Sequence, residues 1–507
     1  MEHKKLMIGV LVILLVAGVA GVSASAPDAS SAISHGGWEL ALALPSWQQV
    51  NSNGFGDTQA GEVSALETFN GYLYAGIHSD THDARIYRSS DGVTWTPVIA
   101  PGFGISHDIA PRAILDFIVF NNRLYTSTGR GGDPGQIYRT LDGLNWAPMV
   151  IYGFNDQDNV DISALGEYNG MIYAGVTNSV TGAQIWRSFT GDNNTWTQVA
   201  PETPGTAAAS ITGLVEFDGA LYAAVESEAP AQIWQSYGGT LGTWTTVVSD
   251  GFGDSNTLST GGMAVFAGYL YAGAGNTANG AQLWRTNDGV TWEQAITPSF
   301  GDPNNQKVEA VFVFQNQLYA GVKNAVTGIE VWRTTDGTLW EQASTDGFGD
   351  SNNTGTNWSN ATADFMSQLH VGTSNVVDGG ELWRMQQPYG VDLSPDQAKL
   401  GAAGQSVTYT IMITNMGTMP DSFDLTTTGQ TWTTTLSTSQ VSLAPAASVA
   451  FTVTVAIPAD ALSNATDAVT VTATSQGDNQ VKDIVVLTTK CTDLVPMIYL
   501  PTLLRIP

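Results

Sequence analysis

One sequence pattern recurs along residues 46–388 and constrains the fold more than any other feature of the chain. Each copy reads as an apolar segment followed by x-Leu-Tyr-Ala-Gly, x-Ile-Trp-Arg and Asp-Gly-x-x-Trp segments. One place in the second segment carries Tyr74, Tyr125, Tyr173, Tyr222, Tyr271, Tyr319 and finally His370. Successive copies are therefore 48 to 51 residues apart. A period near 50 with four short strands in each copy is typical of a β-propeller, whose sheets cover one another's faces.

The two ends of the repeat predict how the ring closes. Six copies end in a fourth-strand Trp, whereas the seventh stops after Arg384. Residues 46–50 look like a fourth strand that has no copy before it. Trp47 lies seven residues before Gly54, the same distance that separates Trp244 from Gly251. We therefore expect the N-terminal strand to complete the last copy and close a seven-bladed ring.

The segment between the third and fourth strands resembles a known repeat. Residues 89–95 read Ser-Ser-Asp-Gly-Val-Thr-Trp, which is similar to the Asp-box (BNR) repeat with one residue fewer. The resemblance implies a structural β-hairpin whose Asp has no catalytic role. The Asp-box family includes sialidases and many proteins that are not enzymes. A sialidase needs three arginines from different blades, but the spare propeller arginines lie only in the first two copies, so its catalytic set cannot be placed.

A second module follows the repeat. Residues 407–414, 449–455 and 469–474 alternate apolar and polar side chains, and about seven short strands fit into residues 389–490. This pattern predicts an immunoglobulin-like β-sandwich. Residues 405–458 resemble the CARDB-like modules of bacterial exported proteins, where such modules act as spacers or stalks. The predicted fold class is therefore all-β: a seven-bladed β-propeller closed by an N-terminal strand, plus a C-terminal immunoglobulin-like β-sandwich.

The chain ends predict export. Lys4 and Lys5 precede an apolar run over residues 6–22 and an Ala-Ser-Ala cleavage site at residues 24–26. We interpret residues 1–26 as a signal peptide and residues 27–45 as a linker, with an uncleaved membrane anchor as the alternative. Cleavage would leave a secreted or cell-surface protein without a transmembrane span. Residues 491–507 form a hydrophobic tail, which is either a surface-sorting segment or a frayed terminus.

Charge narrows the classes of partner. The chain has 46 acidic and 18 basic residues, a formal net charge of −28. This balance argues against a nucleic-acid partner, which requires a basic face, and against an anionic membrane surface. The partner that we expect is an extracellular glycan or a cell-envelope protein.

Side chains outside the repeat framework are the candidates for a binding site. We expect the loops that follow the second and fourth strands to share one face of the propeller and to carry ligands. Trp358, between Asn357 and Asn360, could stack on a sugar ring, or it could pack against a neighbouring loop. Arg112 and Arg130 are arginines that the repeat does not use.

Two clusters suggest metal ligands. The first combines His78, Asp80 and His82 of one loop with His107 and Asp108 of the next, which suits zinc or another divalent ion, and a solvated polar rim is the alternative. The second contains the carboxylates of Asp156, Asp158 and Asp161, which suit calcium. Turn-forming Asx geometry explains this second cluster equally without a metal.

These observations lead to three hypotheses for function. The first is a non-catalytic binding protein that recognises a glycan or a protein through the loop face. The second is a glycan-active hydrolase or lyase that uses Asp and Glu on that face. The third is a structural component of the cell envelope.

Overall fold

The computed structural model describes residues 45–105, 110–130, 134–200, 209–226, 230–356, 358–479 and 481–492, except for the side chains of Trp358 and Ser359. The predicted signal peptide, nearly all of the linker and the tail beyond residue 492 lie outside this part. The candidate residues His107, Asp108 and Asn357 also lie outside it. The described chain is all-β, and its only helical segments are single short turns.

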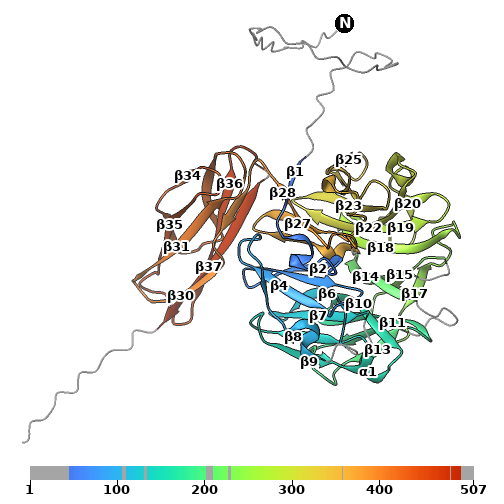
Figure 1. The fold of residues 1–507 in the computed structure, drawn as a ribbon. Helices are drawn as coiled ribbons and strands as arrows, with labels where there is room; N and C mark the ends of the chain where they lie inside the picture. Colours follow the sequence, from blue (N-terminus) through green and yellow to red (C-terminus); the bar gives the residue numbers. More distant parts are fainter. Residues whose placement is uncertain are drawn as a thin grey trace, which may run out of the picture. The chain divides into compact units, whose positions relative to one another are not determined.

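Within the described residues, the repeat folds into seven four-stranded antiparallel units (Figure 1). Units 1 and 2 belong to one sheet because His78 also pairs with Ala113. Unit 1 contains β2 (Glu62–Phe69), β3 (Tyr72–His78), β4 (Arg85–Ser89) and β5 (Thr96–Pro97); unit 2 contains β6 (Ala113–Phe120), β7 (Arg123–Gly129), β8 (Ile137–Thr140) and β9 (Trp146–Val150); unit 3 contains β10 (Asn159–Tyr168), β11 (Met171–Asn178), β12 (Gly182–Ser188) and β13 (Thr197–Ala200). Unit 4 contains β14 (Ser210–Phe217), β15 (Ala220–Glu226), β16 (Gln232–Ser236) and β17 (Thr245–Val248); unit 5 contains β18 (Thr257–Phe266), β19 (Tyr269–Asn276), β20 (Gly280–Thr286) and β21 (Glu293–Gln294); unit 6 contains β22 (Asn305–Phe314), β23 (Gln317–Asn324), β24 (Glu330–Thr334) and β25 (Glu341–Gln342).

The seventh unit is assembled from both ends of the repeat. It contains β26 (Thr362–Phe365), β27 (Gln368–Gly372) and β28 (Leu382–Gln386), and its fourth strand is β1 (Ser46–Gln49). In the antiparallel pairing of β1 with β28, Trp47 lies opposite Met385. This is the pairing that the sequence predicts for the N-terminal strand.

In units 1, 2, 3, 5, 6 and 7, aromatic side chains connect the unit to the loop that enters it. Five of these loops form the short turns η1 (Asn53–Gly56), η2 (Pro101–Gly104), α1 (Tyr152–Asn155), η3 (Pro298–Gly301) and η4 (Asp346–Gly349). In η1, Gly54 and Phe55 both have positive φ angles, so Phe55 projects back onto the unit. Its ring stacks on Tyr87 at 4.4 Å and meets the edge of Trp95 at 5.4 Å. The same trio recurs in unit 5 as Phe252, Trp284 and Trp292.

The second-strand tyrosines join neighbouring units. Tyr74 and the other repeat tyrosines are buried, and the Tyr74 hydroxyl lies where a Cβ on Gly143 of the next unit would stand. Gly143 also has a positive φ angle, so glycine is required there for two reasons. His370 takes the tyrosine place in unit 7 and faces Gly92 of unit 1.

The Asp residues between the third and fourth strands stabilise their turns. Asp91 Oδ1 accepts hydrogen bonds from the backbone amides of Val93 (2.8 Å) and Thr94 (2.6 Å). These bonds outweigh the effect of burial and lower the pKa of Asp91 to about 2. Asp288 and Asp336 bind their own turns in the same way. A carboxylate committed to backbone amides serves the local fold.

The C-terminal module is an immunoglobulin-like domain of two sheets. One sheet has the order β29-β31-β35-β33, and the other has the order β30-β37-β36-β32-β34. The strands are β29 (Val391–Leu393), β30 (Gln397–Ala402), β31 (Ser406–Asn415), β32 (Asp421–Thr428), β33 (Thr433–Leu436), β34 (Gln440–Leu443), β35 (Ser448–Ala456), β36 (Thr466–Ser475) and β37 (Lys482–Thr492). Alternate residues of β31, such as Tyr409 and Ile411, are fully buried in its core.

The last strand extends beyond the boundary that the sequence suggests. β37 ends at Thr492, two residues into the segment assigned to the tail, and Cys491 is buried in the core of the domain. In the described part of the chain, no helix has the length and apolar character needed to cross a membrane.

Candidate functional site

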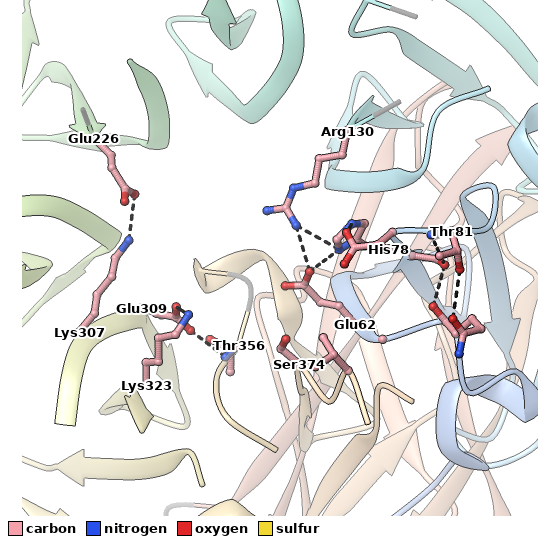
Figure 2. A pocket seen from close by; sticks show the side chains of 15 residues that line it. Glu62, His78, Thr81, Arg130, Glu226, Lys307, Glu309, Lys323, Thr356 and Ser374 are labelled. Carbon is pink, nitrogen blue, oxygen red and sulfur yellow. Dashed lines mark hydrogen bonds and ion pairs between the residues drawn. The ribbon is translucent and has the colours of Figure 1, made fainter. Parts of the chain in front are cut away.

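A cavity of about 640 Å³ lies where the first strands of several units begin and their second strands end (Figure 2). Units 1, 2, 4, 6 and 7 all contribute side chains to it. The lining residues are Gln59, Gly61, Glu62, His78, Ser79, Asp80, Thr81, Arg130, Glu226, Lys307, Glu309, Lys323, Thr356, Ser374 and Val376. Its volume lies within the range of about 300–1,000 Å³ that is usual for ligand pockets.

Glu62, Glu226, Lys307, Lys323 and His78 occupy equivalent places in the repeat. Glu62 lies opposite His78 in the pairing of β2 with β3. The equivalent partners are Ser210 with Glu226 in unit 4 and Lys307 with Lys323 in unit 6. The repeat therefore directs side chains of this register from units 1, 4 and 6 into one cavity.

Glu62, His78 and Arg130 form one hydrogen-bonded group. Nδ1 of His78 lies 2.7 Å from Oε2 of Glu62, and Nη1 of Arg130 donates to the same oxygen at 3.2 Å. Nε2 of His78 lies 3.2 Å from Oδ1 of Asp80. Burial alone would raise the pKa of Glu62, but the His78 hydrogen bond and the Arg130 charge lower it. Glu62 is therefore a buried carboxylate in its charged form.

Two lysines form the second group. Lys307 Nζ donates to Oε2 of Glu226 at 2.9 Å, and Lys323 Nζ donates to Oε1 of Glu309 at 3.2 Å. Glu309 also accepts a hydrogen bond from the Thr356 amide at 3.0 Å. Burial raises the pKa of Glu309 against the opposing effect of Lys323, while the charge of Glu309 raises the pKa of Lys323.

The short helix η5 (Trp358–Ala361) lies among the inner strands. It contacts β2, β6, β18 and β22, which are the first strands of four units. Asn360 Nδ2 donates to the Leu115 carbonyl of β6 at 3.1 Å. The structure therefore places the Asn360 amide in a bond that anchors η5, not among the residues that line the cavity.

Two of the other candidates bind neighbouring loops. Arg112 Nη1 donates to the Asp80 carbonyl at 2.9 Å and thereby supports the loop that carries Ser79 and Thr81. His82 Nδ1 lies 2.8 Å from Oδ2 of Asp57, away from the cavity lining. Of the proposed histidine ligands in the described part, only His78 thus reaches the cavity, and Asp80 lies beside it.

The acidic cluster of unit 3 shows Asx-turn geometry. Asp156 Oδ1 accepts the Asp158 amide at 3.0 Å, and Asp156 Oδ2 accepts Asn178 Nδ2 at 3.0 Å. Asp161 Oδ1 accepts the backbone amide of Arg130 at 2.7 Å. Among the residues that the structure describes, no group of three or more His, Cys, Asp or Glu side chains is arranged to hold a metal ion.

Sequence reasoning identified His78, Asp80 and Arg130 but missed five charged residues of the cavity: Glu62, Glu226, Lys307, Glu309 and Lys323. Two signals could have found them. Lys307 and Lys323 are the only lysines in residues 46–388. Aligning the copies at their repeat aromatic would also have shown that both fall where the other units carry Glu62, Ser210 or His78.

The comparisons with known proteins concern mainly the C-terminal domain. A family model described as the IG-like fold at the C-terminal of FixG matches residues 392–488, in agreement with the two-sheet sandwich. No curated protein matches the chain. A FixG-related protein from Vibrio parahaemolyticus is similar at 14% identity, covering 21% of this chain and 97% of that chain, with a TM-score of 0.17.

Larger parts of the chain resemble two enzyme structures at low similarity. A structure from a study of two prolyl endopeptidases has 11% identity and a TM-score of 0.39 over 71% of this chain, and the match spans 55% of that structure's length. An α-L-arabinofuranosidase from Clostridium thermocellum has 16% identity and a TM-score of 0.30, covering 47% of this chain and 94% of that one. Both likenesses are too distant to carry a functional conclusion.

Proposed function

We propose that residues 46–388 form a seven-bladed β-propeller of the Asp-box type, closed by β1, and that this propeller is a non-catalytic module that recognises a glycan. The seven four-stranded units and the pairing of β1 with β28 support the architecture. The bonds of Asp91 and its equivalents to their own turns support the comparison with the Asp-box repeat.

The cavity is the observation that carries the binding function. It gathers cationic donors such as Arg130 and Lys323 and carboxylate acceptors such as Glu62 and Glu226 within one concave space. Sugar hydroxyls both donate and accept hydrogen bonds, so alternating donors and acceptors suit them. Positions contributed by five units hold these groups on strands and short loops, which fixes their geometry without a ligand-induced folding step.

The proposed setting is outside the cell. The apolar run after Lys4 and Lys5 and the Ala-Ser-Ala site support export, and the net charge of −28 disfavours nucleic acid. We propose that the immunoglobulin-like domain acts as a spacer that presents the propeller to an extracellular glycan. A cell-envelope protein as ligand, or a purely structural envelope role, is the alternative.

A polysaccharide panel tests this proposal. The mature protein, residues 27–507, is passed over immobilised polysaccharides while released reducing ends are measured in solution. Retention without release is the expected result. Absence of retention on every polysaccharide would contradict glycan recognition and would favour an envelope protein as the partner.

A glycan hydrolase is the second candidate because two buried carboxylates share the cavity. The pKa of Glu62 is lowered and that of Glu309 is raised, and such a separation of pKa values is how acid and base roles are divided between two carboxyl groups. Release of reducing ends that disappears in both Glu62→Gln and Glu309→Gln would favour this candidate over the binding module.

A further inference from the structure

We propose that the glycan carries an anionic group, a carboxylate or a sulfate ester, that binds between Lys323 and Arg130 while a hydroxyl of the same sugar donates to Glu226. This inference rests on the proposed glycan-binding function and names the class of glycan. It follows from the arrangement of the lysines and from the exposure of each ion-pair partner.

The two lysines are placed in an unfavourable arrangement. Lys307 and Lys323 lie directly opposite each other on neighbouring strands. Two like charges at such a cross-strand position destabilise a sheet. The five other described pairs at this register carry no two like charges: Glu62–His78, Ala113–Gly129, Asp161–Thr177, Ser210–Glu226 and Ser259–Gly275. Local rules are broken in this way mainly at functional sites.

Lysine is also rare in this part of the chain. Lys307 and Lys323 are the only lysines of residues 46–388, and the protein as a whole carries a net charge of −28. Both occur in one cavity, as Figure 2 shows. A random surface distribution would not bring the only two ammonium groups of the repeat onto neighbouring strands. A ligand group that needs positive charge explains their placement.

The exposed partner of each ion pair indicates what a ligand would meet. Lys323 is 42% exposed and its partner Glu309 only 10%; Arg130 is 35% exposed and its partner Glu62 only 10%. In these two pairs the carboxylate is buried beneath a cation that faces the cavity. Cations facing a cavity bind acceptors and anions.

In the third pair, Lys307 with Glu226, the carboxylate is the more exposed partner. Glu226 is 33% exposed, whereas Lys307 is 12% exposed. Asp80, which is bonded to His78, is a further carboxylate of the lining and is 83% exposed. A ligand in the cavity would therefore meet two cations, Lys323 and Arg130, and two carboxylates, Glu226 and Asp80. A sugar acid or a sulfated sugar offers this combination, because its anionic group suits Lys323 and Arg130 and its hydroxyls can donate to Glu226. A neutral sugar would leave the cations paired only with the buried carboxylates beneath them.

Calorimetric titration of the mature protein with three trisaccharides tests the inference. The probes are trigalacturonate for the carboxylate, a sulfated galactose trisaccharide for the sulfate and isomaltotriose as the neutral sugar. We expect at least one anionic probe to bind about tenfold or more tighter than isomaltotriose. Its affinity should fall as salt concentration rises. The tighter of the two anionic probes identifies the anionic group.

Three variants assign the effect to the cavity. Lys323→Gln and Arg130→Gln should each weaken the anionic probe by about tenfold or more. Lys482→Gln, which removes the same charge from an exposed place on β37 of the immunoglobulin-like domain, should leave the affinity unchanged. Lys323→Arg keeps the charge above Glu309 and should retain most of the binding, so it remains informative if Lys323→Gln does not fold.

The outcomes separate the two proposals. Equal affinity for neutral and anionic probes, or unchanged affinity in Arg130→Gln and Lys323→Gln, would overturn the anionic assignment. In that case retention on neutral polysaccharides would leave the proposed binding function intact. If no trisaccharide binds and the polysaccharide panel retains nothing, both proposals are wrong.

Discussion

Trp47 and Phe348 pack edge to face with ring centroids 4.9 Å apart, although 300 residues lie between them in the chain. Phe348 also stacks on Trp383 at 5.0 Å. The trio has the same form as Phe252, Trp284 and Trp292 of unit 5. Trp47 Nε1 further donates to the Ala343 carbonyl at 2.8 Å. The N-terminal strand thus supplies the aromatic residue that unit 7 lacks.

The first prediction concerns this contact. Trp47→Ala should lower the free energy of unfolding by about 2–4 kcal/mol, because it removes a large partly buried ring from a packed cluster. Trp292→Ala, which removes the equivalent ring from unit 5, is the matched control and should have a similar effect. Urea denaturation measures both variants. If Trp47→Ala lowers the free energy of unfolding by less than about 0.5 kcal/mol while Trp292→Ala has its full effect, β1 does not close the repeat.

The second prediction concerns His370 and pH. His370 is fully buried, and burial together with the Arg384 charge lowers its pKa to about 4 from an ordinary value of 6.5. The His370 imidazole stays neutral in the folded protein at pH values where the same imidazole binds a proton in the unfolded chain. Its neutral burial therefore contributes fully to the free energy of unfolding above pH 6.5, and this contribution is lost as the pH falls from 6.5 towards 4.

His370→Tyr restores the residue that the other six units carry at this place. Between about pH 7 and about pH 5 the wild type should lose about 2 kcal/mol more stability than the variant does. Urea denaturation at both pH values measures the difference. Equal losses in the two proteins would contradict a neutral buried imidazole at the junction of units 7 and 1.

The third prediction separates two roles for Asn360. Its side-chain amide donates to the Leu115 carbonyl, so Asn360→Ala should lower the free energy of unfolding by about 1 kcal/mol. Glycan affinity should stay within about twofold of the wild type, since Asn360 is not a lining residue. Titration and denaturation of the same sample give both values. A large loss of affinity at unchanged stability would instead make Asn360 a sugar contact.

The fourth prediction concerns metal removal at the acidic loop of unit 3. The buried Asn178 donates to Asp156 and Asn159 and accepts the amides of Val180 and Thr181. Asn178→Ala should therefore lower the free energy of unfolding by about 2–3 kcal/mol. Hydrogen bonds alone account for this loop, so a chelator should leave wild-type stability unchanged. A calcium-dependent melt that Asp158→Asn abolishes would instead support a calcium site.

The strand order of the repeat could be predicted because its evidence is local. The tyrosines at a fixed place, the Asp-Gly turns and the Trp47 spacing each specify a short segment, and a period near 50 joins the segments into units. The structure adds packing that no single segment reveals, such as the stack of Phe55 on Tyr87. β37 ends at Thr492, two residues past the boundary expected from the sequence, because Cys491 packs in the core of the domain.

The cavity could be predicted only in part, and the reason is geometric. His78 and Arg130 stand out in the sequence because they lie at the ends of second strands, next to the loops that follow. Glu62 and Glu309 lie within first strands, where an isolated charge reads as an ordinary exposed position. Only the arrangement of the units brings residues 62 and 309 to one cavity, and no short sequence pattern predicts that these two residues lie close together. Asn360 belongs to η5, which contacts first strands of four units, and its amide bonds the Leu115 carbonyl there.

Filling the cavity is the most direct test of the claim that it binds a glycan. Ser374 lines the cavity, whereas Val377 lies three residues further along the same loop, is 63% exposed and does not line it. Titration with the best-retained glycan should show that Ser374→Trp weakens binding by about tenfold or more, while Val377→Trp binds like the wild type. Unchanged affinity in a folded Ser374→Trp protein would contradict the account, because the glycan would then bind elsewhere.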